Sequence, residues 1–272
     1  MKSDKGPIIQ VRDLHKSFSK GRGRVVDVLK GISFDVNRGE TICILGGSGG
    51  GKSTLLKVMI GAHAATKGQV TIDGDDIVGM SETELDRVRR KFGVLFQSGA
   101  LLNSLTVAQN VALLISMHTK IEAATIDIMV MLKLEQVGIR HAGDRLPSEI
   151  SGGMQKRAGL ARAIALDPKI VFYDEPSAGL DPIATTVIDE LINDLKTKMG
   201  MTNVVVTHVM ESVRRIADKV IMLDKGQLIL NGTLDDLLNS KDERIVRFVN
   251  GEVQRPDVQG EEYQRFINDL LM

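Results

Sequence analysis

A glycine-rich segment near residue 50 carries a pattern suited to holding phosphate. Five glycines occur within residues 46–51, and Lys52 follows them directly. Because glycine has no Cβ atom, successive backbone N–H groups can turn toward one phosphate without steric conflict. Lys52 adds a positive charge, and the Ser53 hydroxyl is a ligand that Mg²⁺ accepts. The spacing predicts a P-loop that binds nucleotide phosphates, made of Gly46, Gly47, Ser48, Gly49, Gly50, Gly51, Lys52, Ser53 and Thr54.

Two acidic residues, Asp174 and Glu175, follow the apolar run 170–173. At the carboxyl end of a strand, an aspartate can hold Mg²⁺ directly or through water. The adjacent glutamate can polarise a water that attacks the γ-phosphate. A strand that ends in two acids is more often structural than catalytic. With a P-loop upstream, however, we predict that Asp174 is a metal ligand and Glu175 the catalytic base.

A third segment combines a helix cap with two glycines. Ser151 precedes Gly152, Gly153 and a helical apolar pattern. Serine is a favoured N-cap, and the backbone N–H groups of a helix N-terminus are free to meet an anion. The alternative for this segment is a plain capped helix. Its place upstream of Asp174 favours the anion-binding interpretation.

The elements that must position these residues follow from the apolar pattern. Short β-branched runs alternate with longer helical periodicities, which is typical of a parallel sheet covered by helices. The expected strands are residues 8–11, 32–36, 41–45, 69–72, 92–95, 170–173, 203–207 and 220–224. The expected helices begin near Gly51, Ser81, Ser151, Asp181 and Met210. An α/β fold is therefore predicted.

Three regions depart from this alternation. The first third has strands separated by Gly and Asn turns, which predicts an antiparallel layer. Residues 106–165 have a helical pattern, which predicts a helical insert. Residues 228–229 followed by Asn231-Gly232 predict a closing hairpin. We expect the domain boundaries to be 1–243 for the main domain, about 98–162 for the helical subdomain and 244–272 for a C-terminal tail.

Composition excludes several classes of protein. The 272 residues contain 35 Lys+Arg and 35 Asp+Glu, and aromatic residues are 3% with no Trp. Balanced charge and scarce aromatic rings argue against nucleic acid as a partner. A single cysteine, Cys43, excludes an internal disulfide and predicts a core position. No apolar stretch is long enough to span a bilayer, so we expect any membrane role to come through a partner.

Six motifs occur in the order GGSGGGKST, FQSGA, ISGGMQ, IVFYDEP, SAGLD and VVVTH. Across residues 8 to about 240 this order resembles the nucleotide-binding subunit of an ATP-binding cassette (ABC) transporter. The resemblance implies an ATPase that uses ATP and Mg²⁺. It also implies an α/β P-loop NTPase fold with a RecA-like core, an antiparallel β subdomain and a helical signature subdomain.

The resemblance implies roles for single residues. Gln97 belongs to the Q-loop, which senses Mg²⁺ and the attacking water, and His208 is the switch that contacts the γ-phosphate. Ser151 to Met154 form the signature, and Asp181 belongs to the D-loop. An aromatic residue upstream of the P-loop stacks on adenine, and Phe18 is the candidate. The alternative for Phe18 is packing within the β layer.

The family layout also implies partners. The signature lies in the helical insert, remote from the P-loop, so one chain is not expected to close over its own ATP. The family uses a head-to-tail dimer, in which each ATP lies between the P-loop of one copy and Ser151, Gly152 and Gly153 of the other. The sequence has one P-loop, which implies a second copy as partner. The insert beginning FQSGALLNSLTV would receive the coupling helices of a membrane permease.

Local features narrow the resemblance. FQSGALLNSLTVAQNVAL, DEPSAGLDPIATTVID and Met154, where most cassettes have Gln, are similar to ATPases of the Mla (maintenance of lipid asymmetry) and related Mce-associated transporters. This implies phospholipid movement between the inner and outer membranes of a diderm bacterium, driven from the cytoplasmic face of the inner membrane. The implied partners are a permease, a periplasmic Mce-domain lipid-binding protein and a cytoplasmic STAS-domain protein.

Other interpretations stay open or are excluded. An importer ATPase for a small polar solute, of the amino-acid type, is the alternative because its nucleotide chemistry would be the same. A GTPase would need an NKxD motif, which the sequence lacks. In the tail, one side of a helix would carry Phe266, Ile267, Leu270 and Leu271, which predicts packing on the neighbouring copy. A frayed terminus is the alternative.

Overall fold

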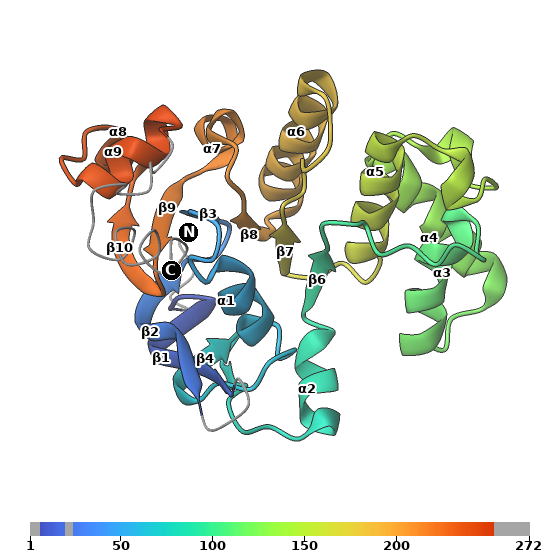
Figure 1. The fold of residues 1–272 in the computed structure, drawn as a ribbon. Helices are drawn as coiled ribbons and strands as arrows, with labels where there is room; N and C mark the ends of the chain where they lie inside the picture. Colours follow the sequence, from blue (N-terminus) through green and yellow to red (C-terminus); the bar gives the residue numbers. More distant parts are fainter. Residues whose placement is uncertain (1–5, 20–23, 253–272) are drawn as a thin grey trace, which may run out of the picture.

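The computed structural model describes residues 6–19 and 24–252 and arranges them as two sheets with a separate group of helices (Figure 1). The strands are β1 (Ile9–Ser19), β2 (Val25–Val36), β3 (Thr41–Gly46), β4 (Lys67–Ile72), β5 (Asp75–Asp76), β6 (Phe92–Leu95), β7 (Ile170–Asp174), β8 (Thr202–Val206), β9 (Lys219–Asp224) and β10 (Gln227–Gly232). The helices are α1 (Lys52–Met59), α2 (Glu82–Arg89), α3 (Val107–His118), α4 (Ala123–Gln136), α5 (Gly152–Ala163), α6 (Pro182–Met199), α7 (Met210–Ile216), α8 (Leu234–Leu238) and α9 (Glu243–Asn250), with short 3-10 helices η1 (Arg140–Ala142) and η2 (Pro147–Glu149).

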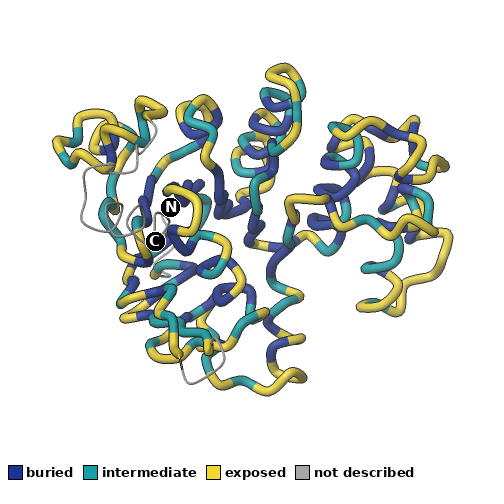
Figure 2. Tube along the Cα trace, in the orientation of Figure 1, coloured by how far each residue is buried: buried dark blue, intermediate teal, exposed yellow. Residues whose placement is uncertain are grey.

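The larger sheet has the strand order β10-β9-β3-β8-β7-β6. Its strands are parallel except β10, which pairs antiparallel with β9 at the edge. Every residue of β3 and β8 is buried, because helices or the second sheet cover both faces. The dark blue band through the centre of Figure 2 follows these strands. The predicted parallel α/β core is confirmed.

Successive residues of the central strands belong to two different hydrophobic cores, since side chains alternate across a strand. Ile42 and Ile44 of β3 pack in the core shared with α1 and the smaller sheet. Cys43 and Leu45 pack in the other core, which includes residues of α6 and α7. Cys43 is fully buried, and burial raises the pKa of its thiol. The core position predicted for Cys43 is therefore confirmed.

The smaller sheet is antiparallel, with the order β2-β1-β4-β5, as the turn pattern predicts. Its first two strands are longer than the predicted 8–11 and 32–36. They pair from Ile9↔Val36 to Ser19↔Val25, with register shifts along the way. Beyond Leu14 the residues of β1 are only partly buried or exposed. Beyond Leu14 the alternation of buried and exposed residues is therefore lost, although β1 and β2 remain paired.

The predicted hairpin at the end of the large sheet is present, but its turn was assigned wrongly. Asp224 pairs with Gln227, so the turn is Lys225-Gly226, and Asn231-Gly232 lie at the end of β10. Both turn residues have positive φ, 46° and 81°. A two-residue hairpin with this geometry favours Asn-Gly or Gly-Gly, so lysine at the first position hid the turn.

The helices α3, α4 and α5 pack on one another beyond β6 (Figure 1). Thr106 caps α3, where its side-chain oxygen accepts from the backbone N–H of Gln109. The C-terminal half of α5 returns to the large sheet and packs on β6. This region agrees with the helical pattern of residues 106–165, and the predicted domain limits stay predictions.

At the C-terminal end of the described chain, residues 243–250 form α9, whose Ile245 is buried in the core that also contains Leu237. The tail residues predicted to contact a second copy, 266–271, lie outside the described residues. Among the helices of residues 6–19 and 24–252, none combines the length and hydropathy needed to cross a bilayer.

Candidate functional site

The P-loop joins the end of β3 to the start of α1. Gly46 ends the strand, residues 47–51 form the turn, and Lys52, Ser53 and Thr54 lie in the first turn of the helix. Gly46 has φ 144°, and a Cβ atom there would lie 2.2 Å from the carbonyl oxygen of Leu223. Glycine at this position is therefore required by the fold itself.

The N-terminus of α1 is open to an anion. Gly51 is its N-cap with φ 103°, and no side chain in the described part of the protein caps the helix. The first N–H groups of a helix have no intrahelical acceptor, so here they are available to a phosphate. Lys52 Nζ donates to the carbonyl oxygens of Gly46 at 2.8 Å and Gly47 at 3.0 Å. The lysine therefore lies across the P-loop.

Asp174 ends β7 and carries an unpaired oxygen. Its Oδ1 atom is buried and has no hydrogen-bond partner among the residues that the structure describes. Burial is the largest cause that raises the pKa of Asp174, and Glu175 raises it further. Three lysines oppose that rise, namely Lys57, Lys52 and Lys156. A buried carboxylate oxygen without a donor is suited to a cation.

Oxygen atoms dominate the predicted metal site. The Ser53 hydroxyl, the Asp174 carboxylate and the Gln97 amide oxygen are the hard ligands that Mg²⁺ prefers. Together with the unpaired Asp174 oxygen, this donor set fits Mg²⁺. The fit supports the assignment of these residues as metal ligands, which stays a prediction.

Glu175 and His208 contact each other through their side chains. Glu175 Oε2 lies 2.9 Å from His208 Nδ1. Glu175 has φ 48°, which is uncommon for a residue other than glycine, and its backbone N–H donates to the carbonyl oxygen of Val206 at 2.9 Å. This backbone turn takes Glu175 out of the strand that Asp174 ends. β7 and β8 are neighbours, so the acid and the histidine meet at their shared carboxyl edge.

Gln97 follows β6, which pairs with β7 in parallel. Its side chain is exposed, and its backbone carbonyl accepts a hydrogen bond from Lys156 Nζ. The structure therefore brings the P-loop, Gln97, Asp174, Glu175 and His208 to the carboxyl ends of four parallel strands. Ligands of open α/β sheets bind at this edge. We call this region the catalytic edge.

The signature and the D-loop meet at a different place. Ser151 caps α5, where its hydroxyl accepts from Met154 N at 3.3 Å. Asp181 caps α6, where its Oδ1 accepts from two backbone N–H groups at 2.9 Å. Ser151, Gly152, Gly153 and Asp181 line one hollow, and none of the described residues that line it belongs to the P-loop. We call it the signature hollow.

Phe18 lies in β1, where it pairs with Val26. Its half-buried ring meets the His63 ring edge-on with centroids 5.5 Å apart, and Lys16 Nζ lies 4.7 Å from its centroid. These contacts place Phe18 at the rim of the antiparallel sheet. Adenine stacking by this ring stays a prediction.

Two lysines near the carboxylates are absent from the sequence-based set. Lys57 lies on α1, and Lys156 lies on α5 with its ammonium group beside the backbone of Gln97. No motif marks either residue, because their proximity to Asp174 depends on how helices pack against strand ends. Lys57 is exposed and Lys156 is buried, and the approach of either to Asp174 is visible only in the folded chain.

The chain is similar in sequence to proteins of known families. The family described as "ABC transporter" matches residues 29–178, which is more than half of the chain. The chain is 42% identical over 249 residues to the intermembrane phospholipid transport system ATP-binding protein MlaF of Haemophilus influenzae, covering 92% of each chain. It is 41% identical over 246 residues to the probable ribonucleotide transport ATP-binding protein mkl of Mycobacterium leprae, covering 90% of this chain and 70% of that protein.

Solved structures agree with the sequence comparison. The ATP-binding cassette MJ0796, in a dimeric post-hydrolysis state bound to ADP and Pi, has a TM-score of 0.78 at 29% identity, covering 83% of this chain and 98% of that chain. The cbiO1 protein of Clostridium perfringens, part of the ABC transporter complex cbiONQ, has a TM-score of 0.77 at 29% identity, covering 92% and 96%. The shared fold, the family match and the catalytic edge lead to one conclusion: the chain belongs to the ABC transporter family and is an ATPase of that family.

Proposed function

We propose that the chain is the ATP-hydrolysing subunit of a transporter that moves phospholipids between the inner and outer membranes of a bacterium and maintains outer-membrane lipid asymmetry. The observation that carries the chemistry is the Glu175–His208 contact beside the unpaired Asp174 oxygen. The Haemophilus influenzae relative, named for phospholipid transport and matched over nearly its whole length, supports the cargo.

Each group at the catalytic edge has a task in hydrolysis. The P-loop N–H groups and Lys52 bind the phosphates, and Ser53, Asp174 and Gln97 would hold Mg²⁺. When bound, the metal supplies positive charge that offsets the charge of the phosphates.

Glu175 acts on the attacking water. Its carboxylate takes a proton from the water as the new bond to the γ-phosphorus forms and the bond to the bridging oxygen of ADP breaks. His208, held by Glu175, contacts the γ-phosphate and stabilises the charge on the phosphoryl group as it is transferred to water. The products are ADP and inorganic phosphate.

Two copies of the chain complete each site in this proposal. The signature hollow is lined apart from the P-loop, so its free N–H groups would meet ATP bound to another copy. The MJ0796 cassette bound to ADP and Pi is itself dimeric, which supports this arrangement. Ser151, Gly152 and Gly153 of one copy would then contact the γ-phosphate held by Lys52 of the other.

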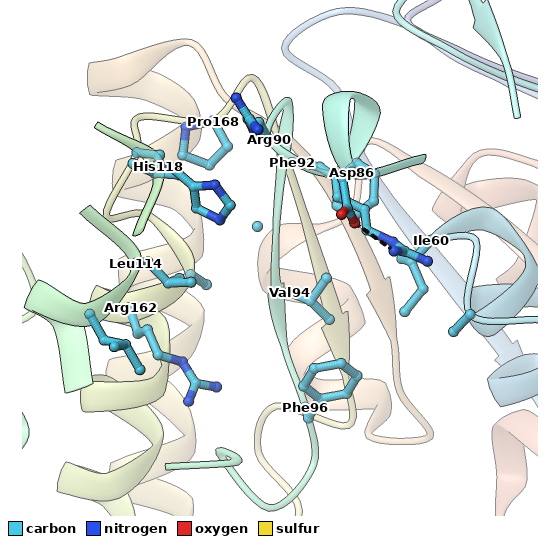
Figure 3. A pocket seen from close by; sticks show the side chains of 16 residues that line it. Ile60, Asp86, Arg90, Phe92, Val94, Phe96, Leu114, His118, Arg162 and Pro168 are labelled. Atoms are coloured by element: carbon cyan, nitrogen blue, oxygen red, sulfur yellow. Dashed lines mark hydrogen bonds and ion pairs between the residues drawn. The ribbon is translucent and has the colours of Figure 1, made fainter. Parts of the chain in front are cut away.

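A groove between the large sheet and the group of helices beyond β6 would receive the permease. It lies between β6 with α2 and the helices α3 and α5, and Figure 3 shows its side chains facing one another. Phe92, Val94 and Leu114 give it apolar walls, and His118 and Arg162 add polar groups. An apolar groove with a few polar groups suits a short amphipathic helix. The chain would then lie peripherally at the cytoplasmic face of the inner membrane.

The remaining partners would contact other surfaces or only the permease. Several apolar side chains at the end of α3, in the loop after it and on α4 are exposed, and a cytoplasmic STAS-domain protein would cover them; they are Met117, Ile121, Ile128, Met131 and Leu132. A periplasmic Mce-domain lipid-binding protein would reach the chain only through the permease. Nucleic acid is not expected as a partner.

A small polar solute is the second candidate cargo. The mycobacterial relative named for ribonucleotide transport is 41% identical, nearly as similar as the relative named for phospholipid transport. Both cargoes would use the same catalytic edge, because cargo specificity lies in the permease. Identification of the cargo therefore needs the assembled complex.

Purification of the full chain with its membrane partners tests the proposal. Mass spectrometry of the extracted complex is expected to find phospholipid and an Mce-domain protein. A complex without an Mce-domain protein, with ATP hydrolysis stimulated by a polar solute, would support the second candidate instead. Phe96→Asp in the groove should detach the chain from membranes, whereas Val25→Asp, on an exposed side chain of β2, should not.

A further inference from the structure

Lys156 is a buried cation that the proposed mechanism leaves without a task. It lies in α5, and only 6% of the residue is exposed. Its Nζ atom donates to the carbonyl oxygen of Gln97 and lies 3.5 Å from the carbonyl oxygen of Glu175. One ammonium group therefore contacts the backbone of both residues to which we assign roles around the attacking water.

The surroundings of Lys156 compensate its buried charge. Burial lowers the pKa of Lys156, whereas the carboxylates of Asp174 and Glu175 raise it. A buried ammonium is costly unless it is paired and hydrogen-bonded. Two carbonyl contacts and two nearby carboxylates supply that compensation. Groups of the catalytic edge therefore stabilise the buried charge of Lys156.

The same face of α5 holds the rest of the Q-loop backbone, residues 97–100. Arg162 donates to the carbonyl oxygens of Gly99 at 3.2 Å and Ala100 at 2.5 Å. A Cβ atom at Gly159 would lie 3.0 Å from the Gly99 oxygen, so the loop passes close to the helix there. Lys156, Gly159 and Arg162 are three residues apart, a spacing that places them on one side of the helix.

These contacts give Lys156 a different position from Arg162. Arg162 fixes the Q-loop to α5 alone, whereas Lys156 also reaches Glu175 at the end of β7. Glu175 has φ 48°, a conformation that persists only when its surroundings enforce it. Lys156 therefore connects the signature helix, the Q-loop and the strained backbone of Glu175.

We propose that Lys156 is a positioning residue for ATP hydrolysis, which holds Gln97 and Glu175 in register with the signature helix through their backbone carbonyls. The inference rests on the roles proposed above for Gln97 and Glu175. A shift of α5 would then move the Q-loop and alter the position of the catalytic carboxylate together. Nucleotide binding at the P-loop would depend little on Lys156.

Steady-state ATP hydrolysis by the full chain tests this role. Lys156→Met should lower kcat by about 10-fold or more while the KM for ATP stays within about twofold, because the P-loop is unchanged. Lys156→Arg, which keeps the charge and the donors, should recover most of kcat. Lys133→Met is the matched control: Lys133 is equally buried at 5% but is paired with Asp167, outside both sites. It should lower thermal stability and leave kcat close to wild type.

A double-mutant cycle with Gln97→Ala separates positioning from general stability. If Lys156 acts through Gln97, adding Lys156→Met to Gln97→Ala should reduce kcat much less than it does in the wild type. Additive losses would overturn the part of the proposal that concerns Gln97, and wild-type kcat in a folded Lys156→Met or Lys156→Gln protein would overturn it as a whole. Wild-type hydrolysis by Glu175→Gln in the same assay would instead reject the catalytic roles themselves.

Discussion

The glycines of the P-loop and those of the signature are required for different reasons. A Cβ atom at Gly46 would lie 2.2 Å from a backbone oxygen of the same chain, and Gly46 and Gly51 both have positive φ. Gly152 and Gly153 have neither feature: among the described residues, the nearest atoms to a Cβ there would be Leu180 Cδ2 at 4.0 Å and Ala184 Cβ at 3.5 Å. The P-loop is shaped by its own chain, whereas the signature glycines leave space that its own chain does not fill.

The two regions also differ in charge. The catalytic edge gathers Lys52, Asp174, Glu175 and His208, and it includes a strained backbone and an unpaired oxygen. The signature hollow offers small residues and capped helix N-termini. The first region has the groups that break a bond, and the second has a surface that a bound phosphate can approach. The two regions therefore have complementary tasks, which two copies of the chain can combine.

The largest effect is expected from Lys52→Ala at the catalytic edge. The substitution removes the cation of the P-loop, so ATP hydrolysis should be lost. Thermal unfolding should change little, because among the described residues Lys52 donates only to two carbonyls of its own loop. Release of inorganic phosphate measures the first, and calorimetry the second. Retained hydrolysis would show that the catalytic edge is assigned wrongly.

Glu175→Gln should keep ATP binding and lose turnover by about 10² to 10⁴, because an amide cannot take the proton of the attacking water. The variant should accumulate as a dimer that holds ATP. Size-exclusion chromatography with labelled ATP checks this outcome. A wild-type rate would remove Glu175 from the catalytic role.

Gly153→Asp probes the signature hollow with a charge. A Cβ atom at residue 153 would make only an ordinary contact with Ala184, so the variant should fold, but its carboxylate would repel phosphate held by another copy. A like-charge contact costs several kcal/mol, so hydrolysis should fall by about 100-fold. Equilibrium binding of ATP to the isolated chain serves as the control and should persist. Unchanged hydrolysis would contradict a catalytic use of the hollow.

Alanine at the two kinds of glycine should change stability in opposite directions. Gly46→Ala should lower the free energy of unfolding by about 1–3 kcal/mol or more, since the added atom collides with the backbone. Gly153→Ala should raise it by about 0.5–1 kcal/mol, because alanine favours the helix more than glycine does. Urea denaturation of both variants compares the values. Equal destabilisation would remove the distinction between the two regions.

Site features formed by residues adjacent in the sequence could be predicted from the sequence alone. Gly46 to Ser53 form one continuous segment, and Asp174 and Glu175 directly follow an apolar run, so both could be assigned before the fold was known. The contact between Glu175 and His208 needs β7 beside β8, a pairing of segments about 30 residues apart. The order of the six motifs along the chain, rather than the spacing within one motif, assigned His208 to the same site as Glu175.

The features that escaped prediction depend on packing or on backbone ladders. Lys156 has an ordinary helical position in the sequence, and only the approach of α5 to the Q-loop brings it to Gln97. The outer part of β1 has too little burial to show a strand pattern. The Lys225-Gly226 turn has a residue that such turns seldom favour. In each case the feature depends on a contact between residues far apart in the sequence or on the backbone conformation.

Mixing two variants tests the central claim that one copy's P-loop works with another copy's signature. Lys52→Ala and Gly153→Asp are each expected to be nearly inactive. In a mixed head-to-tail dimer, the intact P-loop of one variant faces the intact signature of the other, which restores one site. The mixture should therefore hydrolyse ATP well above the sum of the two separate variants. A rate equal to that sum would contradict the shared site.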